Sequence, residues 1–530
     1  MHPRWNDVRT QWAAAAGVAG LVATWLTAAV TFYQHDADTL VPKLASTMEW
    51  SFYYWHAGRN GQLLPLLAMP FSHPLTNLVT QQWLGTWAGV MAIYLLVAFV
   101  MRDREWFVPG TAALACFLAG ATCFGHAMYL EGSQTYGTAM ALVLGGLLLV
   151  RRASLRRADA QRLAVAAVLF AAAAWVNQLV CLFVAVLVAC DALAGDDEPT
   201  DRELAGEDPL ARLLAGLPAV PPLVHIWLVR SALSLGLLLG SGVALLVAVK
   251  LFTLGGEGER LTMSFVSPTR YPAALARFTA TIRDTIVAPR GALLVALAAV
   301  AAAWLEGRGA RPRAVTALAA AAVAFFLVVV GLKWVTMNDC HPRYALPAIV
   351  TAYACIGMVL VAAVREAVAN VSQTRRLAPA ARWALVVTIP ATLLGSYGWP
   401  DAGAPRRAIA TLGSPLAEQV VESGVGFVAG DYWSLWPVVF KANLIIRDRG
   451  EDRQVWGLGF RAADTRHRWA DGMRERGATV AYLARTPQPC GHHLPWIAKH
   501  LDLEVGDCAG SSGDFELYPF RLRDDRIARR

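Results

Sequence analysis

Two carboxylates separated by one residue are the groups in this sequence best suited to chemistry. Asp36 and Asp38 follow the first apolar segment, residues 11–33, in the stretch His-Asp-Ala-Asp at 35–38. A general base must lie within hydrogen-bond reach of the proton that it removes, and a carboxylate where a span meets water is partly desolvated, which makes it a better base. We therefore consider Asp36 and Asp38 the candidate bases. The alternative is that Asp38 caps a helix over residues 39–46 and Asp36 is simply hydrated.

A third carboxylate, Glu131, lies in the second short loop predicted on the same side of the membrane, about one helical turn after His126. An acid on that side suits an acid/base role or the positioning of an acceptor. An equally good alternative is that Glu131 is simply a hydrated acid of the loop, with no role in chemistry.

Several cationic and aromatic residues lie in loops next to apolar segments. A phosphate leaving group develops negative charge, which guanidinium groups match well. A single interfacial Arg is usually a lipid-headgroup anchor, so a phosphate site requires that several of them converge. The candidate substrate- and phosphate-binding residues are His56, Arg59, Arg270, Tyr271, His341, Arg343 and Tyr344.

The composition is that of a polytopic membrane protein. Of the 530 residues, 56% are hydrophobic and only 16% are charged, with a mean hydropathy of +0.42. Several apolar runs approach the roughly 18–20 residues that cross a bilayer, and we interpret the first as a retained span. The net charge of +8 does not indicate nucleic-acid binding, because residues 400–530 carry 18 Lys/Arg and 17 Asp/Glu. The excess lies in the loops, where it sets orientation.

The apolar runs predict the path of the chain through the membrane. The segment 163–190 is interrupted by Asn177 and Gln178, and could be one long helix or a hairpin. A hairpin concentrates more of the loop Lys and Arg on the cytoplasmic side and places the two amides at a turn, so we favour it, with about 11 spans in total. The predicted spans are 11–33, 76–101, 106–128, 134–150, 163–190, 225–252, 291–305, 314–336, 343–364 and 383–399.

This topology divides the chain into a transmembrane domain, residues 1–399, and a small C-terminal α/β domain, residues 400–530. The first outside loop is residues 34–75, a second long outside loop is residues 253–290, and the acidic linker 193–224 is cytoplasmic. Short β-like runs at 425–429, 455–460, 479–483 and 515–520 predict the strands of the second domain. Cys490 and Cys508 could form a disulfide if that domain faces an oxidising compartment.

Three features make the sequence similar to the GT-C glycosyltransferases, polytopic enzymes that use polyprenyl-phosphate sugars. They are the acidic first loop at 35–38, residues 343–347 (Arg-Tyr-Ala-Leu-Pro) at the start of a span, and a C-terminal domain on the same outside face. Residues 430–437 (Gly-Asp-Tyr-Trp-Ser-Leu-Trp-Pro) also resemble a segment of many bacterial members. Members of this family include the protein O-mannosyltransferases and the bacterial aminoarabinose transferase. The resemblance implies a mainly α-helical GT-C fold.

The resemblance implies that an Asp of the first loop is the catalytic base, and the matching residue is Asp36 or Asp38. Some family members carry an Asp-Glu pair there, whereas this sequence has Asp-x-Asp. We expect no metal and no other cofactor. A divalent cation at Asp36 and Asp38 is possible but not favoured, because the Trp-Trp-Asp signature of the oligosaccharyltransferase branch is missing.

The expected function is inverting transfer of a sugar from a polyprenyl-phosphate donor to an envelope glycan, glycolipid or protein acceptor. The expected location is the inner membrane of a bacterium, with the N-terminus in the cytoplasm and the C-terminal domain in the periplasm. Donor, acceptor and lipid bilayer are the expected partners. The alternatives are a transporter or flippase of lipid-linked saccharides, and a non-catalytic accessory protein of the same fold.

Overall fold

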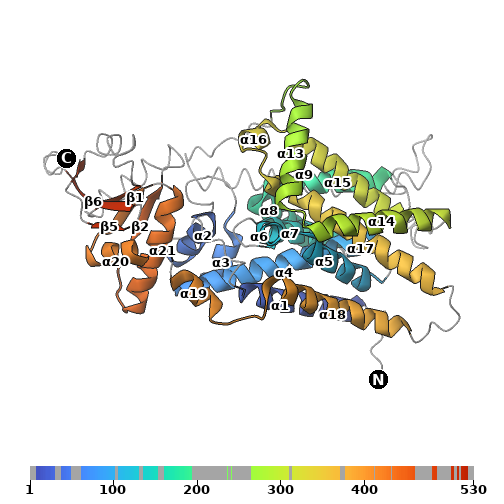
Figure 1. Cartoon of the computed structure of the whole chain (residues 1–530), viewed down its shortest axis with the longest axis horizontal. Helices are drawn as coiled ribbons and strands as arrows, with labels where there is room; N and C mark the ends of the chain where they lie inside the picture. The colour runs from blue at the N-terminus through green and yellow to red at the C-terminus, as the bar shows by residue number, and fades with distance from the viewer. Residues whose placement is uncertain are drawn as a thin grey trace. The chain divides into compact units, whose positions relative to one another are not determined.

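The computed structural model divides the chain into two compact units, which we describe separately (Figure 1). The membrane unit comprises Met1–Leu26, Trp83–Leu254 and Leu261–Pro400, and the sheet unit comprises Thr27–Gln82, Gly255–Arg260 and Asp401–Arg530. The expected division of the sequence at residue 400 into two domains stays a prediction. The structure describes residues 8–29, 37–48, 50, 61–101, 105–130, 135–152, 160–193, 236, 240, 264–308, 313–369, 377–410, 412, 414–430, 432–459, 480–485, 503–505, 510–512 and 515–522.

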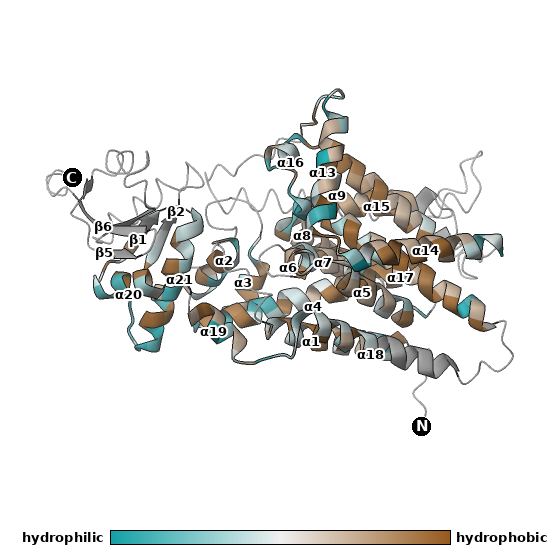
Figure 2. Ribbon diagram, in the orientation of Figure 1, coloured by the Kyte–Doolittle hydropathy of each residue, from teal (hydrophilic) through white to brown (hydrophobic). Residues whose placement is uncertain are grey.

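The membrane unit is built of apolar helices. Figure 2 shows hydrophobic colour along much of α14, α15 and α17. Among the described residues, three helical segments are long and apolar enough to cross a membrane, namely Pro74–Met101, Pro289–Gly307 and Pro342–Val368. The protein is therefore a membrane protein, while the predicted number of spans stays a prediction.

The described helices of the membrane unit are α1 (Val8–Thr27), α4 (Pro74–Met101), α5 (Phe107–Gly120), α6 (Cys123–Leu130), α7 (Tyr136–Arg152), α8 (Ala160–Val176), α9 (Gln178–Leu193), α13 (Tyr271–Thr285), α14 (Pro289–Gly307), α15 (Arg313–Gly331), α16 (Lys333–Met337), η3 (Pro342–Ala345), α17 (Leu346–Ala369) and α18 (Leu377–Tyr397). Helices α1 and α4 contribute residues to both units.

Two predicted spans contain a break in the helix. The segment 163–190 is divided between α8 and α9 at Asn177, whose Oδ1 accepts the amide of Leu179 at 3.1 Å. The segment 106–128 is divided between α5 and α6, where the amide of Thr122 donates to the carbonyl of Ile286 at 2.8 Å. These bonds satisfy backbone groups that a helix break would otherwise leave unpaired, which is costly inside a membrane. The predicted span 225–252 lies outside the described residues except for residues 236 and 240.

Close packing of small residues joins α5 to α17. A Cβ atom added to Gly357 in α17 would lie 2.4 Å from the amide nitrogen of Ala113 in α5. Likewise, a Cβ on Gly120 would lie 2.4 Å from the ring of Tyr353. Small residues of this kind let membrane helices approach closely and gain dispersion contacts.

The sheet unit contains a mixed sheet. Its strand order in the described residues is β2-β1-β3-β6-β4, with β5 paired to β6. Strand β1 is parallel to β2 and β3, whereas β6 is antiparallel to β3, β4 and β5. The strands are β1 (Phe427–Gly430), β2 (Trp456–Gly459), β3 (Val480–Arg485), β4 (Leu503–Val505), β5 (Gly510–Ser512) and β6 (Phe515–Leu522), and the helices are α2 (Ala37–Thr47), α3 (Leu63–Ala68), α19 (Ala404–Ala410), α20 (Ser414–Glu422) and α21 (Tyr432–Asp448).

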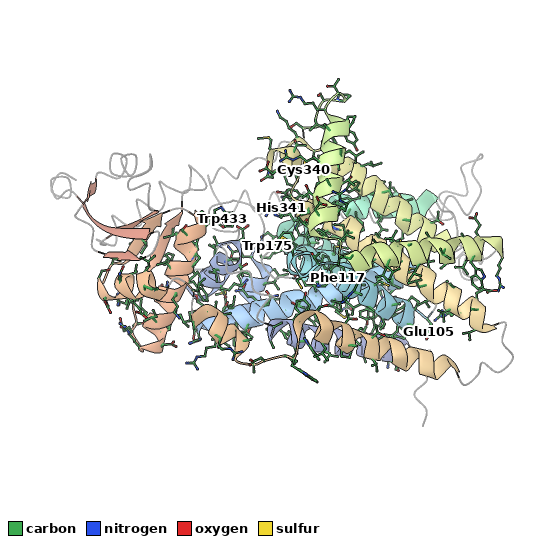
Figure 3. All side chains as sticks on the ribbon, in the orientation of Figure 1. Glu105, Phe117, Trp175, Cys340, His341 and Trp433 are labelled. Carbon is green, nitrogen blue, oxygen red and sulfur yellow. The ribbon has the colours of Figure 1, made fainter. Side chains whose placement is uncertain are left out.

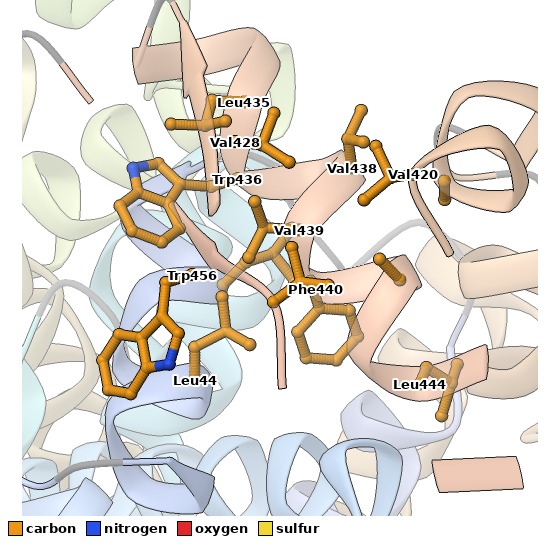
Figure 4. Packing of buried hydrophobic residues seen from close by; sticks show 14 of the residues in the cluster. Leu44, Val420, Val428, Leu435, Trp436, Val438, Val439, Phe440, Leu444 and Trp456 are labelled. Atoms are coloured by element: carbon orange, nitrogen blue, oxygen red, sulfur yellow. The ribbon is translucent and has the colours of Figure 1, made fainter. Parts of the chain in front are cut away.

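One hydrophobic core holds helix α2, from the loop after the first apolar helix, against helix α21. Leu44 of α2 lies in the same buried cluster as Trp436 and Val439 of α21 (Figure 4). Helix α2 can pack in this way because its apolar side chains recur at helical spacing and so lie on one face. On β2, Gly457 leaves room for the Trp436 ring, since a Cβ there would lie 2.6 Å from it. The packing joins segments almost 400 residues apart in sequence, as Asp38 and Tyr432 are separated by 394 positions.

Candidate functional site

Asp38 is the predicted base that the structure describes. It lies in the first turn of α2, which begins at Ala37, so it is inside the helix instead of capping a helix that begins at Thr39. The carboxylate is partly buried, and its Oδ1 accepts a hydrogen bond from the Tyr432 hydroxyl at 2.8 Å. A carboxylate in the first turn also interacts favourably with the positive end of the helix dipole. Asp36 lies outside the described residues.

A buried polar network holds α2 in place from its other end. The amide of Asn77 in α4 donates to Ser46 Oγ at 2.7 Å and to the carbonyls of Ala68 and Phe71 at 2.9 and 3.1 Å. Its Oδ1 accepts the Gln81 amide at 2.6 Å. Sequence reasoning missed this network, because Asn77 and Gln81 lie at i and i+4 within what reads as the start of a membrane span. Their shared helix face was the available signal.

In the segment 430–437, noted for its resemblance to bacterial family members, Gly430 ends β1 and Tyr432 begins α21. Tyr432 is buried, with 4% of its surface exposed, whereas the neighbouring Trp433 is 49% exposed (Figure 3 labels Trp433). The two rings meet edge to face with their centroids 5.1 Å apart. The structure therefore brings Tyr432 of this segment into contact with Asp38.

In the membrane unit, Arg343 lies in η3, immediately before helix α17. Its guanidinium donates to the Tyr344 hydroxyl at 3.0 Å and lies 5.0 Å from the centre of that ring. His341 precedes η3, and its Nδ1 accepts the Arg343 amide at 3.3 Å. Tyr344 is buried and packs edge to face on Trp334 at 4.3 Å. Three of the predicted binding residues thus form one contiguous cluster.

Arg270 and Tyr271 lie at the start of α13, which packs on α15. The Tyr271 hydroxyl donates to the carbonyl of Leu327 in α15 at 2.7 Å, and Phe278 of α13 stacks on Phe326 with centroids 5.5 Å apart. Burial raises the pKa of the Tyr271 phenol above its ordinary value, so the hydroxyl stays protonated and remains a donor. The segment before α13 pairs with the α15–α16 junction, because the Lys333 amide donates to the Ser264 carbonyl at 2.8 Å.

A tight turn connects α16 to η3. Asp339 and Cys340 have φ angles of 55° and 53°, in the left-handed region that non-glycine residues seldom adopt. The Asp339 carboxylate accepts a bond from Arg277 of α13 at 3.1 Å, which helps to hold the turn. Burial raises the pKa of the Cys340 thiol, so it is a neutral thiol at physiological pH and a poor nucleophile. Figure 3 shows Cys340 and His341 side by side near α13 and α16.

The remaining predicted site residues, Glu131, His56 and Arg59, lie outside the described residues, and their roles stay predictions. Within the part of the chain that the structure describes, no three His, Cys, Asp or Glu side chains gather in a way that could hold a metal ion.

His126 of α6 is fully buried, with Nδ1 2.5 Å from the Tyr397 hydroxyl and Nε2 3.1 Å from the Phe117 carbonyl. These bonds give it a structural role between α5, α6 and α18.

No family model matches the sequence, and no curated protein matches it in a sequence comparison. The fold, in contrast, is similar to that of a solved membrane protein, ArnT from Cupriavidus metallidurans, so the resemblance expected from the sequence is confirmed at the level of the fold.

The crystal structure of ArnT from Cupriavidus metallidurans bound to undecaprenyl phosphate is similar over 96% of this chain and 98% of that chain, with a TM-score of 0.54 and 11% sequence identity. An oligosaccharyltransferase of Archaeoglobus fulgidus, tethered to an acceptor peptide, is similar over 91% of this chain and 70% of that chain, with a TM-score of 0.43 and 13% identity. The second likeness is too weak to support an argument, and the first establishes the fold alone.

Proposed function

We propose that the protein is an inverting membrane glycosyltransferase that takes a sugar from a polyprenyl-phosphate donor. The acceptor is a hydroxyl of an envelope glycan, glycolipid or protein. The proposed site of action is the periplasmic face of a bacterial inner membrane, with the N-terminus in the cytoplasm and the C-terminal region in the periplasm.

The observation that carries the proposal is the place of Asp38 within a GT-C fold. The fold likeness extends over nearly the whole of both chains, and Asp38 lies on the first helix after α1, where the resemblance implies the catalytic base. Its carboxylate is partly buried and already accepts one hydrogen bond from a hydroxyl. A carboxylate in such a setting can accept the proton of an acceptor hydroxyl as well.

The proposed reaction is a single displacement at the anomeric carbon. Asp36 or Asp38 removes the proton of the acceptor hydroxyl while its oxygen forms the new glycosidic bond. The bond from the anomeric carbon to the phosphate oxygen breaks at the same time, and its electron pair leaves with the polyprenyl phosphate. The Arg343 guanidinium is the proposed stabiliser of the charge on that phosphate, and Arg270, Tyr271, His341 and Tyr344 are the other proposed binding residues of the membrane unit.

The test uses the purified full chain in lipid vesicles. It is incubated with a panel of polyprenyl-phosphate monosaccharides and envelope extract, and released polyprenyl phosphate is measured by mass spectrometry. Asp36→Asn and Asp38→Asn are compared with wild type. We expect one variant to lose about 100-fold or more of the rate, which is the usual contribution of a general base.

Asp448→Asn is the matched control, because Asp448 is an exposed carboxylate of the same unit that pairs with His73 at 3.2 Å. It should retain activity. Full activity in both Asp36→Asn and Asp38→Asn would refute the base assignment. Movement of the intact donor across the bilayer without cleavage would instead favour the flippase alternative, and inactivity of the wild type on every donor would favour the accessory protein.

A further inference from the structure

Tyr432, at the start of α21, touches the candidate base from a segment that sequence reasoning had left without a role. Its hydroxyl donates to Asp38 Oδ1 at 2.8 Å. We infer that Tyr432 is a positioning residue, which orients the Asp38 carboxylate toward the acceptor hydroxyl. This inference rests on the proposed function and adds to it a contribution from the C-terminal part of the chain.

The two elements that carry the pair are both firmly held. Tyr432 is buried, and the residues that follow it in α21, including Leu435 and Trp436, are completely buried in the sheet-unit core. Leu40 and Leu44 of α2 lie in that same core. Because each partner is fixed by its own helix, the hydrogen bond can hold the carboxylate within the small angular range that a catalytic group requires.

The chemistry of the pair suits a general base. A tyrosine hydroxyl donates one hydrogen bond and stays protonated at neutral pH, so it steadies the charged carboxylate and does not compete for the proton. A hydrogen bond to a charged group is stronger than one between neutral groups and has better defined geometry. Removal of the hydroxyl should therefore slow the chemical step and leave donor binding unchanged.

The test is a double-mutant cycle in lipid vesicles, with release of polyprenyl phosphate as the measurement. Tyr432→Phe should lower kcat about tenfold or more and leave the KM for the donor within about twofold of the wild-type value. In the Asp38→Asn background, where no carboxylate remains to orient, Tyr432→Phe should have no further effect on the residual rate.

Tyr94→Phe is the matched control, because Tyr94 is also a buried tyrosine whose hydroxyl has a side-chain partner, Thr111 at 3.1 Å, and it lies in the membrane unit. It should retain wild-type kcat. Thermal unfolding of each variant separates a loss of folding from a loss of rate. The positioning role would be overturned by full activity of Tyr432→Phe, or by an equal loss of rate in the wild-type and Asp38→Asn backgrounds.

The outcomes also separate this inference from the proposed function. If Asp38→Asn abolishes transfer but Tyr432→Phe is fully active, the inference fails and the glycosyltransferase stands. If Asp38→Asn is fully active, Asp38 is not the base and both the assignment and the inference fail.

Discussion

At the scale of single residues, the contacts of Arg343 bear on its proposed role at a phosphate. Its guanidinium is anchored by the Tyr344 hydroxyl and lies over the same ring. Such contacts fix the plane of the guanidinium. A lysine ammonium carries the same charge, but it has neither the paired N–H donors of a guanidinium nor a flat face that stacks on a ring.

We therefore expect Arg343→Lys to raise the KM for the polyprenyl-phosphate donor about tenfold, because a bidentate contact to phosphate becomes a point-charge contact. Steady-state kinetics over a range of donor concentrations measure it. Arg365→Lys is the control, since Arg365 makes an exposed ion pair with Glu105 at 3.2 Å and should behave like wild type. An unchanged KM in Arg343→Lys would remove Arg343 from the proposed phosphate site.

At the scale of elements, α5 and α17 approach each other so closely that position 357 has room only for glycine. The Ala112–Ala113 backbone of α5 lies where the side chain of any residue larger than glycine at position 357 would begin. The position of α17 matters for the site, because η3 with Arg343 leads directly into it. A displacement of α17 would therefore move the proposed phosphate-binding cluster.

Gly357→Ala should lower the free energy of unfolding by about 1–3 kcal/mol, because a backbone and not a flexible side chain obstructs the new methyl group. The reduction appears as a lower melting temperature of the purified protein in detergent. Gly395→Ala in α18 is the matched control, as nothing lies within 4 Å of its added Cβ. It should be neutral or slightly stabilising, since alanine is the better helix former. Equal melting temperatures for both variants would show that α5 and α17 do not pack as described.

The buried Asn77 network shows what an element requires beyond hydrophobic packing. Helix α2 is amphipathic, and its apolar side chains alone would allow it to slide along α21. The bonds that Asn77 makes to Ser46 and to the α3 end are directional. They specify one placement of α2, and with it the placement of Asp38 against Tyr432.

At the scale of the whole molecule, the proposed function depends on which side of the membrane each part faces. The first loop and the C-terminal region belong to one compact unit, so we expect them to face the same side. The Lys and Arg in the predicted cytoplasmic loops predict that this side lies outside the cytoplasm.

Reporter fusions test this orientation. An alkaline phosphatase fused at Cys508 should be active, because that enzyme requires the oxidising periplasm, and a green fluorescent protein inserted at Asp197 should fluoresce, because that linker is expected in the cytoplasm. The reciprocal fusions, with the two reporters exchanged, are the controls and should be silent. The reverse pattern would contradict the orientation and, with it, use of a donor on the periplasmic face.

The sequence was sufficient for features that depend on local pattern. Hydropathy located most of the apolar helices, and the predicted strand runs overlap β1, β2, β3 and β6, because periodicity and burial are recorded in neighbouring residues. The break at Asn177 was likewise visible as a polar interruption. The Asp-x-Asp loop could be recognised as chemically unusual without any knowledge of the fold.

The sequence could not predict contacts between distant segments. Three such contacts depend on how the elements pack. They are the bond from Tyr432 to Asp38, the bond from Asn77 to Ser46, and the bond from Arg277 to Asp339. Strands β4 and β5 were also missed, because they are only three residues long and exist through pairing with β6. Local sequence patterns reflect the interactions of a residue with its neighbours along the chain. The candidate site is assembled across hundreds of positions, and its geometry therefore emerges only on folding.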